Sequence, residues 1–193
     1  EKVAEHLRHS DLDTEIPKET ADDVFRTILA SKENIVLTGM PGSGKSTIGK
    51  LLKIDGFEFV DTDAEIEKRC GCSIRELIEQ KGEKYFRDLE SQVIRDVSSE
   101  SSRIISTGGG AILREENIHC LKRNGKLFFV DAKLGRLQAT DDRPFSDTYE
   151  KIKKLYTQRI DIYRESADVV IPDMQTPESE AEYIIKKRME LIL

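Results

Sequence analysis

The feature that most limits what this chain can fold into is a glycine-rich loop between a short apolar run and an amphipathic segment. The loop has the pattern G-x4-G-K-S over residues 39–46; β-branched and apolar residues at 34–38 precede it, and Ile48, Leu51 and Leu52 follow it at helical spacing. In such a unit the glycines let successive backbone N–H groups turn inward around a phosphate, and the helix N-terminus adds its positive dipole end. The sequence therefore predicts a P-loop that binds a nucleoside triphosphate.

Individual positions of this loop have expected roles. Lys45 is expected to reach the β- and γ-phosphate oxygens, and Ser46 to offer its hydroxyl to Mg²⁺. The predicted nucleotide-binding residues of the loop are Gly39, Pro41, Gly42, Ser43, Gly44, Lys45, Ser46 and Thr47. The sequence contains no guanine-specific Asn-Lys-x-Asp motif, which favours ATP over GTP.

From residue 34 onward, short β-branched or aromatic runs alternate with amphipathic segments of helical length. The expected strands are 34–38, 57–60, 103–106, 127–130 and 168–171. This alternation is typical of βαβ units, so we expect an α/β domain over 34–193 with a five-stranded parallel sheet flanked by helices on both faces. Residues 1–33 are acidic and interrupted by Pro17, and an apolar stripe within them predicts a helical N-terminal extension.

Composition excludes several classes of partner. The net charge is −6, so no global positive field attracts nucleic acid. No apolar run approaches the roughly 20 residues of a membrane helix, and residues 1–20 lack the apolar core of a signal peptide. We therefore expect a cytoplasmic protein that binds neither nucleic acid nor membrane. We also expect it to be a monomer, which the composition does not test. Cys70, Cys72 and Cys120 lack zinc-ligand spacing and are expected to be reduced structural thiols.

Acidic residues end two of the expected strands. Asp61 follows 57–60 and Asp131 follows 127–130, and either is in the right place to hold the water shell of a metal bound to the nucleotide. Asp63 lies two residues beyond Asp61, where a helix over 64–69 is expected, so one carboxylate would face metal waters and the other a hydroxyl acceptor. The alternative is that Thr62 caps the helix and one aspartate supports it.

Two arginines fall on expected buried stripes of helices. Arg87 precedes Glu90 by three residues on a helix whose apolar stripe includes Glu90, and Arg159 lies on the stripe of a helix over 149–164. Guanidinium groups in such positions are suited to bidentate capture of a carboxylate on the acceptor. The alternatives are a surface ion pair for Arg87 and an Arg159 side chain that extends to water.

Two loops complete the candidate site. Gly108, Gly109 and Gly110 follow the strand 103–106, and such a run is best explained by close approach of another group to the backbone. Residues 132–148 are polar and contain Arg136 and Arg143, as expected for a lid that brings an arginine to the transferring phosphoryl group. An ordinary turn and a plain surface loop are the alternatives.

These motifs together resemble the shikimate kinase family over about residues 34–190. The matching segments are Gly39–Thr47, Asp61–Asp63, Gly82–Arg87, Gly108–Gly110, Arg143-Pro144, Arg159 to Tyr163 and Ala167-Asp168. The resemblance implies a P-loop kinase fold with a lid, and transfer of the γ-phosphate of MgATP to the 3-hydroxyl of shikimate on the route to chorismate and aromatic amino acids. Residues 1–33 have no counterpart in the minimal family, Phe145 replaces a usual Leu, and the distance from Lys45 to Asp61 is one residue short.

The resemblance also implies residue roles. The implied shikimate-binding residues are Asp63, Arg87, Gly108, Gly109, Gly110 and Arg159, with both arginines on the carboxylate. Asp63 would orient the 3-hydroxyl and accept its proton. Asp61 and Ser106 would support Mg²⁺ through water, and Ser46 would ligate it. Arg143 would lie against adenine, and Arg136 or Lys45 would meet the moving phosphoryl group.

Two other functions fit the sequence. One is a kinase for another small polyol acid, such as gluconate, which would share the P-loop without needing Arg87 and Arg159 on one carboxylate. The other is a nucleotide-binding regulatory module that has lost turnover. The presence of Lys45, Ser46, Asp61 and Asp63 argues against the second.

Overall fold

A computed structural model describes residues 32–137 and 148–192. The predicted N-terminal extension, up to residue 31, lies outside the described residues. So do residues 138–147 of the predicted lid, including Arg143. The domain boundary expected at residue 34 therefore stays a prediction.

The core of the structure is a five-stranded, wholly parallel sheet with the strand order β2-β3-β1-β4-β5. The strands are β1 (Asn34–Thr38), β2 (Glu58–Asp61), β3 (Arg103–Ser106), β4 (Gly125–Asp131) and β5 (Val169–Pro172). All five were predicted; β1 and β3 have the expected bounds, and the others differ by one or two residues. In β1 the side chains of Ile35 and Leu37 pack on one face of the sheet and Val36 on the other, as strand geometry requires.

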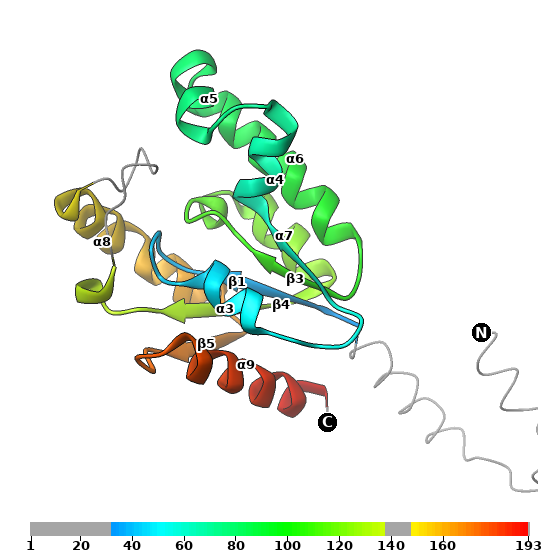
Figure 1. The fold of residues 1–193 in the computed structure, drawn as a ribbon. Helices are drawn as coiled ribbons and strands as arrows, with labels where there is room; N and C mark the ends of the chain where they lie inside the picture. The colour runs from blue at the N-terminus through cyan, green and yellow to red at the C-terminus, as the bar shows by residue number, and fades with distance from the viewer. Residues whose placement is uncertain (1–31, 138–147, 193) are drawn as a thin grey trace, which may run out of the picture.

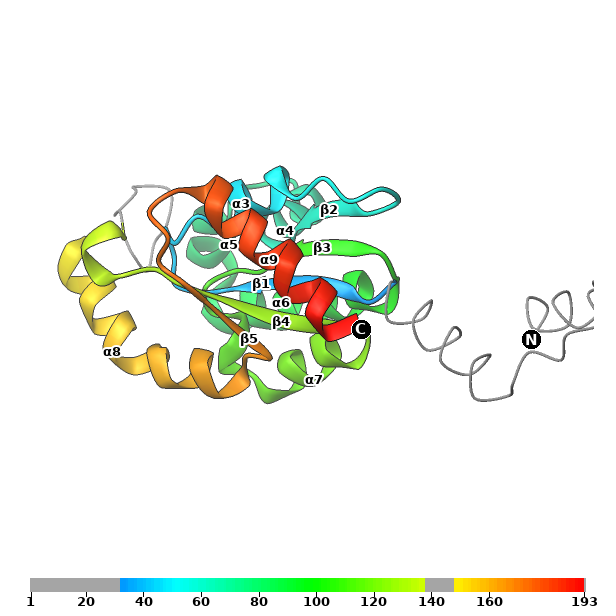
Figure 2. The ribbon, with the colours of Figure 1, turned by 90° about the horizontal axis from the view of Figure 1, so that it is seen from below.

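Helices cover both faces of the sheet (Figures 1 and 2). The helices are α3 (Lys45–Leu51), α4 (Thr62–Cys70), α5 (Ile74–Lys81), α6 (Glu83–Ser99), α7 (Glu115–Arg123), α8 (Tyr149–Ser166) and α9 (Pro177–Ile192), with short 3-10 turns at Ala111–Leu113 and Leu134–Arg136. One apolar cluster joins α4, α5, α6 and α7 to the sheet, and a second joins α3 and α9 to its opposite face. This arrangement confirms the predicted α/β fold.

Helix α8 packs beyond the ends of the central strands, beside the P-loop. Its residues Ile152, Ile160 and Tyr163 form a third cluster with Met40 of the P-loop and Phe129 of β4. The rings of Phe129 and Tyr163 are stacked, with centroids 5.1 Å apart. This packing sets the buried stripe of α8 against the same end of the sheet as the P-loop.

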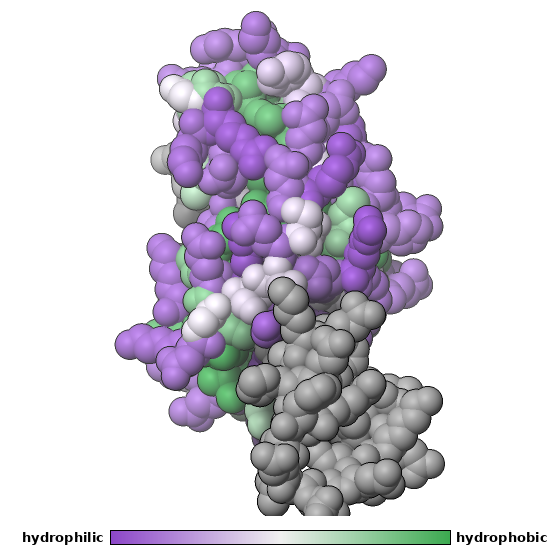
Figure 3. All heavy atoms as spheres, turned by 90° about the vertical axis from the view of Figure 1, so that its right-hand side faces the viewer, coloured by the Kyte–Doolittle hydropathy of each residue, from purple (hydrophilic) through white to green (hydrophobic). Residues whose placement is uncertain are grey.

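The surface of the molecule is mainly polar on the face shown in Figure 3, where hydrophobic side chains occur only in small separate areas. Within residues 32–137 and 148–192, no helix has both the length and the apolar character needed to cross a membrane.

Gly49 allows α3, which carries Lys45 and Ser46, to lie close to the sheet. A Cβ at this position would be 2.4 Å from Cε2 of Phe59 and 3.3 Å from Cδ1 of Leu37. Alanine is better than glycine in a helix by about 1 kcal/mol, but overpacking costs about 1–3 kcal/mol. The 2.4 Å contact with the Phe59 ring favours the upper end of this cost, so we expect Gly49→Ala to lower the free energy of unfolding in urea by about 2 kcal/mol net. Gly135→Ala is the control, because a Cβ at this position would have no other atom within 4 Å. Equal free energies of unfolding for the two variants would contradict the close-packing argument.

Candidate active site

The P-loop folds around the ammonium group of Lys45. Gly42 and Gly44 have φ values of 80° and 91°, a region that favours glycine, and Gly44 is the N-cap of α3. Lys45 is buried, and its Nζ donates to the carbonyl oxygens of Gly39 at 3.0 Å and Met40 at 2.9 Å. The lysine that the sequence assigns to phosphate oxygens is thus held inside the loop that would surround them.

Three oxygen-bearing side chains meet where α3 begins and two strands end. Ser46 Oγ donates to Asp61 Oδ2 at 2.6 Å and lies 3.1 Å from Ser106 Oγ. Asp61 and Ser106 are register partners on β2 and β3, so the sheet itself places them side by side. Hard oxygen donors in this number fit a divalent cation that takes few protein ligands and keeps several waters and substrate phosphates.

The second candidate for the metal carboxylate, Asp131, is placed elsewhere. Its Oδ2 accepts a hydrogen bond from Arg164 of α8 at 3.1 Å, on the outside of the molecule. Of the two strand-end aspartates, only Asp61 contacts the P-loop serine within the described residues. The geometry therefore selects Asp61 from the two alternatives.

Asp61, rather than Thr62, caps the helix that follows β2. Asp61 Oδ1 accepts from the backbone N–H groups of Asp63 and Ala64, whereas Thr62 is the first residue of α4. The hydroxyl of Thr62 is fully buried and accepts a hydrogen bond from the N–H of Gly108 at 3.0 Å. The suggestion that Thr62 caps the helix is wrong, because its side chain is used to fix the glycine loop.

The three glycines of that loop lie against side chains of the protein itself. A Cβ on Gly108 would be 2.5 Å from Asp63 Oδ1, one on Gly109 would be 2.7 Å from Cδ of Pro41, and one on Gly110 would be 2.3 Å from Nη1 of Arg87. The predicted close approach to this backbone is present. It brings an aspartate, a P-loop proline and an arginine onto one short loop.

Arg87 and Glu90 form a buried pair on α6. Nη1 of Arg87 lies 2.8 Å from Oε2 of Glu90, whose side chain is 1% exposed, so the pair is not on the surface. Burial raises the pKa of the Glu90 carboxyl, against the lowering effect of Arg87. Oε1 of Glu90 accepts no hydrogen bond from the described residues.

Arg159 projects from the buried stripe of α8 into the same region. Its residue is 7% exposed, and Nη1 donates to the carbonyl oxygen of Gly109 at 2.8 Å, so the side chain does not extend to water. Burial lowers the pKa of Arg159, and the like charge of Arg87 also lowers it. Within residues 32–137 and 148–192, Arg159 has no carboxylate ion pair. Arg87 pairs with the buried Glu90 and also with the more exposed Glu83, whose Oε1 lies 3.4 Å from its Nε, whereas Arg159 pairs with neither. The two guanidinium groups lie in one buried region and are candidates for binding an anionic ligand.

The hydroxyl of Tyr163 links the P-loop to the glycine loop, a connection that the sequence did not predict. It lies 2.8 Å from the carbonyl oxygen of Gly39 and 2.6 Å from that of Gly109. Burial raises the pKa of Tyr163, so the phenol keeps its proton as a donor. The position of Tyr163 on the apolar stripe predicted its burial, but nothing in the pattern identified its two partners.

The family model described as shikimate kinase matches residues 41–189. The shikimate kinase of Caldicellulosiruptor bescii is 43% identical over 162 residues, which cover 79% of this chain and 94% of that protein. This chain belongs to the shikimate kinase family.

Solved structures of the family agree with this assignment. A shikimate kinase from Acinetobacter baumannii, in complex with shikimate, has a TM-score of 0.79 at 31% identity and covers 86% of this chain and 98% of its own. The shikimate kinase from Aquifex aeolicus has a TM-score of 0.71 at 37% identity over 81% of this chain. A gluconokinase from Sinorhizobium meliloti, 13% identical with a TM-score of 0.54, shares the fold. The family carries out ATP-dependent phosphotransfer and implies a divalent metal, which the Ser46–Asp61–Ser106 cluster fits.

The predicted lid contains two arginines, and the structure describes only one of them. Arg143 lies outside the described residues. Arg136 is described, and its Nη1 forms ion pairs with Asp173 and with the buried Glu180 of α9. The structure therefore places Arg136 against the β5–α9 segment, and contact with a phosphoryl group would require exchange of these pairs.

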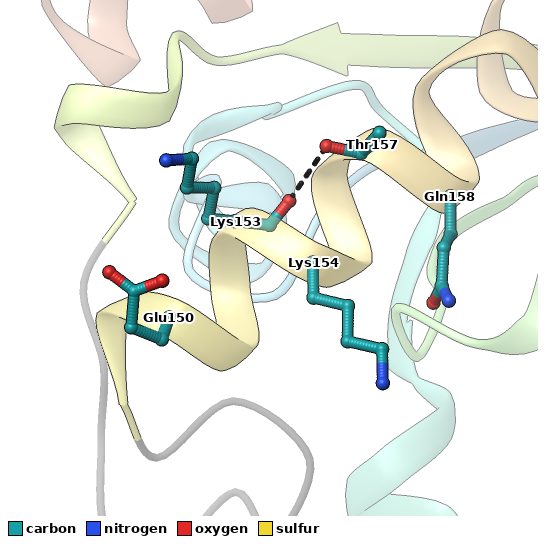
Figure 4. Close-up of a pocket in the computed structure, with 5 residues that line it drawn as sticks. All are labelled: Glu150, Lys153, Lys154, Thr157 and Gln158. Atoms are coloured by element: carbon teal, nitrogen blue, oxygen red, sulfur yellow. Dashed lines mark hydrogen bonds between the residues drawn. The ribbon is translucent and has the colours of Figure 1, made fainter.

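A hollow along α8 is lined by none of the residues of the shikimate kinase motifs. It is lined by Glu150, Lys153, Lys154, Thr157 and Gln158. Figure 4 shows these side chains along α8, all on exposed residues, and Thr157 donates to the carbonyl oxygen of Lys153 at 3.1 Å. No predicted site residue lines this hollow, so it does not compete with the glycine loop as the acceptor site.

Proposed function

We propose that this chain transfers the γ-phosphate of ATP to the 3-hydroxyl of shikimate, giving shikimate 3-phosphate for chorismate and aromatic amino-acid biosynthesis. The observation that carries the proposal is the convergence of Asp63, Arg87 and Arg159 on the Gly108–Gly110 loop, directly beside the P-loop. Such a site has an anion-binding side and a carboxylate that faces a hydroxyl, as a hydroxy acid requires.

The acceptor is held at both ends in this proposal. Arg87 and Arg159 bind the shikimate carboxylate, and the backbone of the Gly108–Gly110 loop lies along the ring. Asp63 orients the 3-hydroxyl and accepts its proton as the oxygen attacks the γ-phosphorus. A new O–P bond then forms while the bond from the β–γ bridging oxygen to the γ-phosphorus breaks, and ADP leaves.

The donor nucleotide occupies the P-loop. Lys45 contacts the β- and γ-phosphate oxygens, and backbone N–H groups of residues 39–47 surround the β-phosphate. We retain the proposals that Arg143 contacts adenine and that Arg136 reaches the phosphoryl group on lid closure. The metal is proposed to be Mg²⁺, ligated by Ser46 with Asp61 and Ser106 acting through water, and it would neutralise phosphate charge.

Asp61→Asn tests the metal assignment separately from the helix cap. Asparagine is as good an N-cap as aspartate, so the fold of α4 is retained while the charge near Ser46 is lost. We expect the Mg²⁺ concentration for half-maximal activity to rise by about tenfold or more, as for loss of a metal-supporting partner. Asp131→Asn, at the other strand end, should leave it unchanged. An equal response of the two variants to Mg²⁺ titration would contradict the assignment.

The function is tested most directly by ADP release measured with shikimate, quinate and gluconate as acceptors. We expect ADP release to require ATP, Mg²⁺ and shikimate, with phosphorylated shikimate identified by mass spectrometry. Faster turnover of gluconate would indicate a different polyol-acid kinase. ATP binding without any phosphorylated product would indicate a regulatory module.

The remaining assignments concern the whole chain. We propose that the protein acts in the cytoplasm as a monomer without nucleic-acid or membrane partners, and that residues 1–33 are an extension added to the kinase domain. Sedimentation velocity of the full chain and of a chain beginning at Lys32 tests the monomer and the extension together.

A further inference from the structure

Two thiols that phosphoryl transfer does not use lie in contact at the end of α4. Cys70 is the last residue of α4, Cys72 follows Gly71, and their Sγ atoms are 3.4 Å apart. Cys72 Sγ donates to Cys70 Sγ, and Cys70 Sγ donates to the carbonyl oxygen of Cys72 at 3.1 Å. Both residues are half-buried, so their sulfur atoms pack on the protein without being sealed from solvent.

The backbone at Gly71 produces this contact. Gly71 is the C-cap of α4 and has φ 71° and ψ 17°, the left-handed conformation that ends many helices. A Cβ there would meet no atom within 4 Å, so glycine is needed for its conformation and not for space. The turn folds the residue after the helix back onto the last residue of the helix.

The two sulfur atoms are close enough that a small movement would bring them to disulfide distance. A disulfide has an S–S length of about 2.05 Å, so the two sulfur atoms have to approach by about 1.4 Å, which side-chain rotation can supply. Cys120, on α7, makes no sulfur–sulfur contact within the described part of the chain. Among the described residues, Cys70 and Cys72 are therefore two thiols in contact, whereas Cys120 is an isolated thiol.

We propose that Cys70 and Cys72 are a redox-active dithiol site, which hydroperoxides oxidise to an intramolecular disulfide. This inference does not depend on the proposed phosphoryl transfer. The hydrogen bond to Cys70 raises the pKa of the Cys72 thiol, so the proton stays on Cys72 and the Cys70 sulfur accepts from it. The Cys70 sulfur, which accepts the hydrogen bond from Cys72, is proposed as the first to react.

The reaction proceeds in two balanced steps. In the first step, the Cys70 sulfur attacks a peroxide oxygen, so that an S–O bond forms and the O–O bond breaks. The displaced alkoxide, or hydroxide when the oxidant is hydrogen peroxide, takes the thiol proton and leaves as an alcohol or as water. In the second, the Cys72 sulfur attacks the sulfenic sulfur of Cys70; the S–S bond forms and the S–O bond breaks. The departing hydroxide takes the Cys72 proton as water, so two thiols and one hydroperoxide give a disulfide, an alcohol and water.

Peptide mass spectrometry of the full chain tests the proposal. Trypsin cleaves after Arg69 and Arg75, so one peptide contains both thiols. The reduced protein is treated with hydrogen peroxide, its remaining thiols are alkylated, and it is digested without reductant. We expect this peptide to lose the mass of two hydrogen atoms and to escape alkylation, and dithiothreitol to restore both thiols. The peptide that contains Cys120 should be alkylated as before treatment.

Single variants separate a paired site from general thiol oxidation. Cys120→Ser should form the disulfide as the wild type does, whereas Cys70→Ser and Cys72→Ser should not form it within the chain. Three results would overturn the proposal. The first is addition of oxygen atoms to Cys70 or Cys72 of the wild type without loss of hydrogen, and the second is a disulfide to Cys120 or to a second chain. The third is a Cys70–Cys72 pair that stays reduced when glutathione in the same tube is oxidised. Circular dichroism of each variant confirms that it is folded.

Discussion

Asp63→Ala is expected to lower kcat for shikimate phosphorylation by about 100- to 10,000-fold, the range for loss of a general base, while ATP binds as before. The two other carboxylates nearby have different tasks, because Asp61 accepts from Ser46 and Glu90 pairs with Arg87. Asp63 Oδ1 is the atom nearest to where a Cβ on Gly108 would lie, at 2.5 Å. Its loss would leave the P-loop intact. Steady-state kinetics gives kcat, and calorimetry gives the affinity for ATP.

Two further variants make this prediction specific. Asp63→Asn keeps the shape of the side chain and removes its basicity, so we expect the same loss of kcat. Glu65→Gln is the matched control on the same helix; Glu65 pairs with Lys68 and Arg69 at the surface, and such pairs contribute little. If Asp63→Asn kept kcat within tenfold of the wild type, the proton-acceptor role would be wrong.

Arg159→Ala is expected to weaken shikimate binding by about 30-fold or more, which corresponds to about 2 kcal/mol for a charged hydrogen bond in a buried site. The guanidinium is buried beside Arg87 without a carboxylate ion pair in the described residues, so the ligand would supply the missing negative charge. Shikimate affinity is measured by calorimetry or from KM. Arg164→Ala, five residues along α8, is the control because Arg164 is half exposed and pairs with Asp131.

The carboxamide of shikimate tests which part of the acceptor Arg159 contacts. The wild type should bind shikimate much more tightly than its amide, because only the acid carries the charge that the arginines attract. The Arg159→Ala variant should lose most of this preference. If the variant discriminated acid from amide as strongly as the wild type, Arg159 would not bind the carboxylate.

The fold was predictable because local signals and tertiary structure agree. The glycine loop required a strand before it and a helix after it, and the alternation of apolar runs gave all five strands. The strand order β2-β3-β1-β4-β5 was not predicted, because it depends on which strands pair across the sheet and not on the periodicity of any one segment. The neighbourhood of Asp61 and Ser106, which are distant in sequence and adjacent in register, was implied only by the family resemblance and not by any local pattern.

In the candidate site, the burial of charged side chains was predictable from the sequence. The groups to which the buried polar side chains bond were predictable only in part. The apolar stripes of α6 and α8 placed Arg87, Glu90 and Arg159 inside. The partners of Thr62 and Tyr163 come from segments 46 residues or more away, and no local pattern encodes them. The glycine run signalled close approach without revealing that the approaching groups belong to the protein. Arg136 was expected to act on a phosphoryl group, but its carboxylate partners on β5–α9 were not anticipated.

The phenol of Tyr163 has a consequence for how the two substrates meet. Because its hydroxyl contacts the carbonyl oxygens of both Gly39 and Gly109, it ties the P-loop to the glycine loop in the protein without ligands, and we expect it to help set the distance between the proposed nucleotide and acceptor sites. The protein, and not contact between the two substrates, would then align the γ-phosphorus with the attacking oxygen. We expect removal of this hydroxyl to weaken the connection between the two proposed sites.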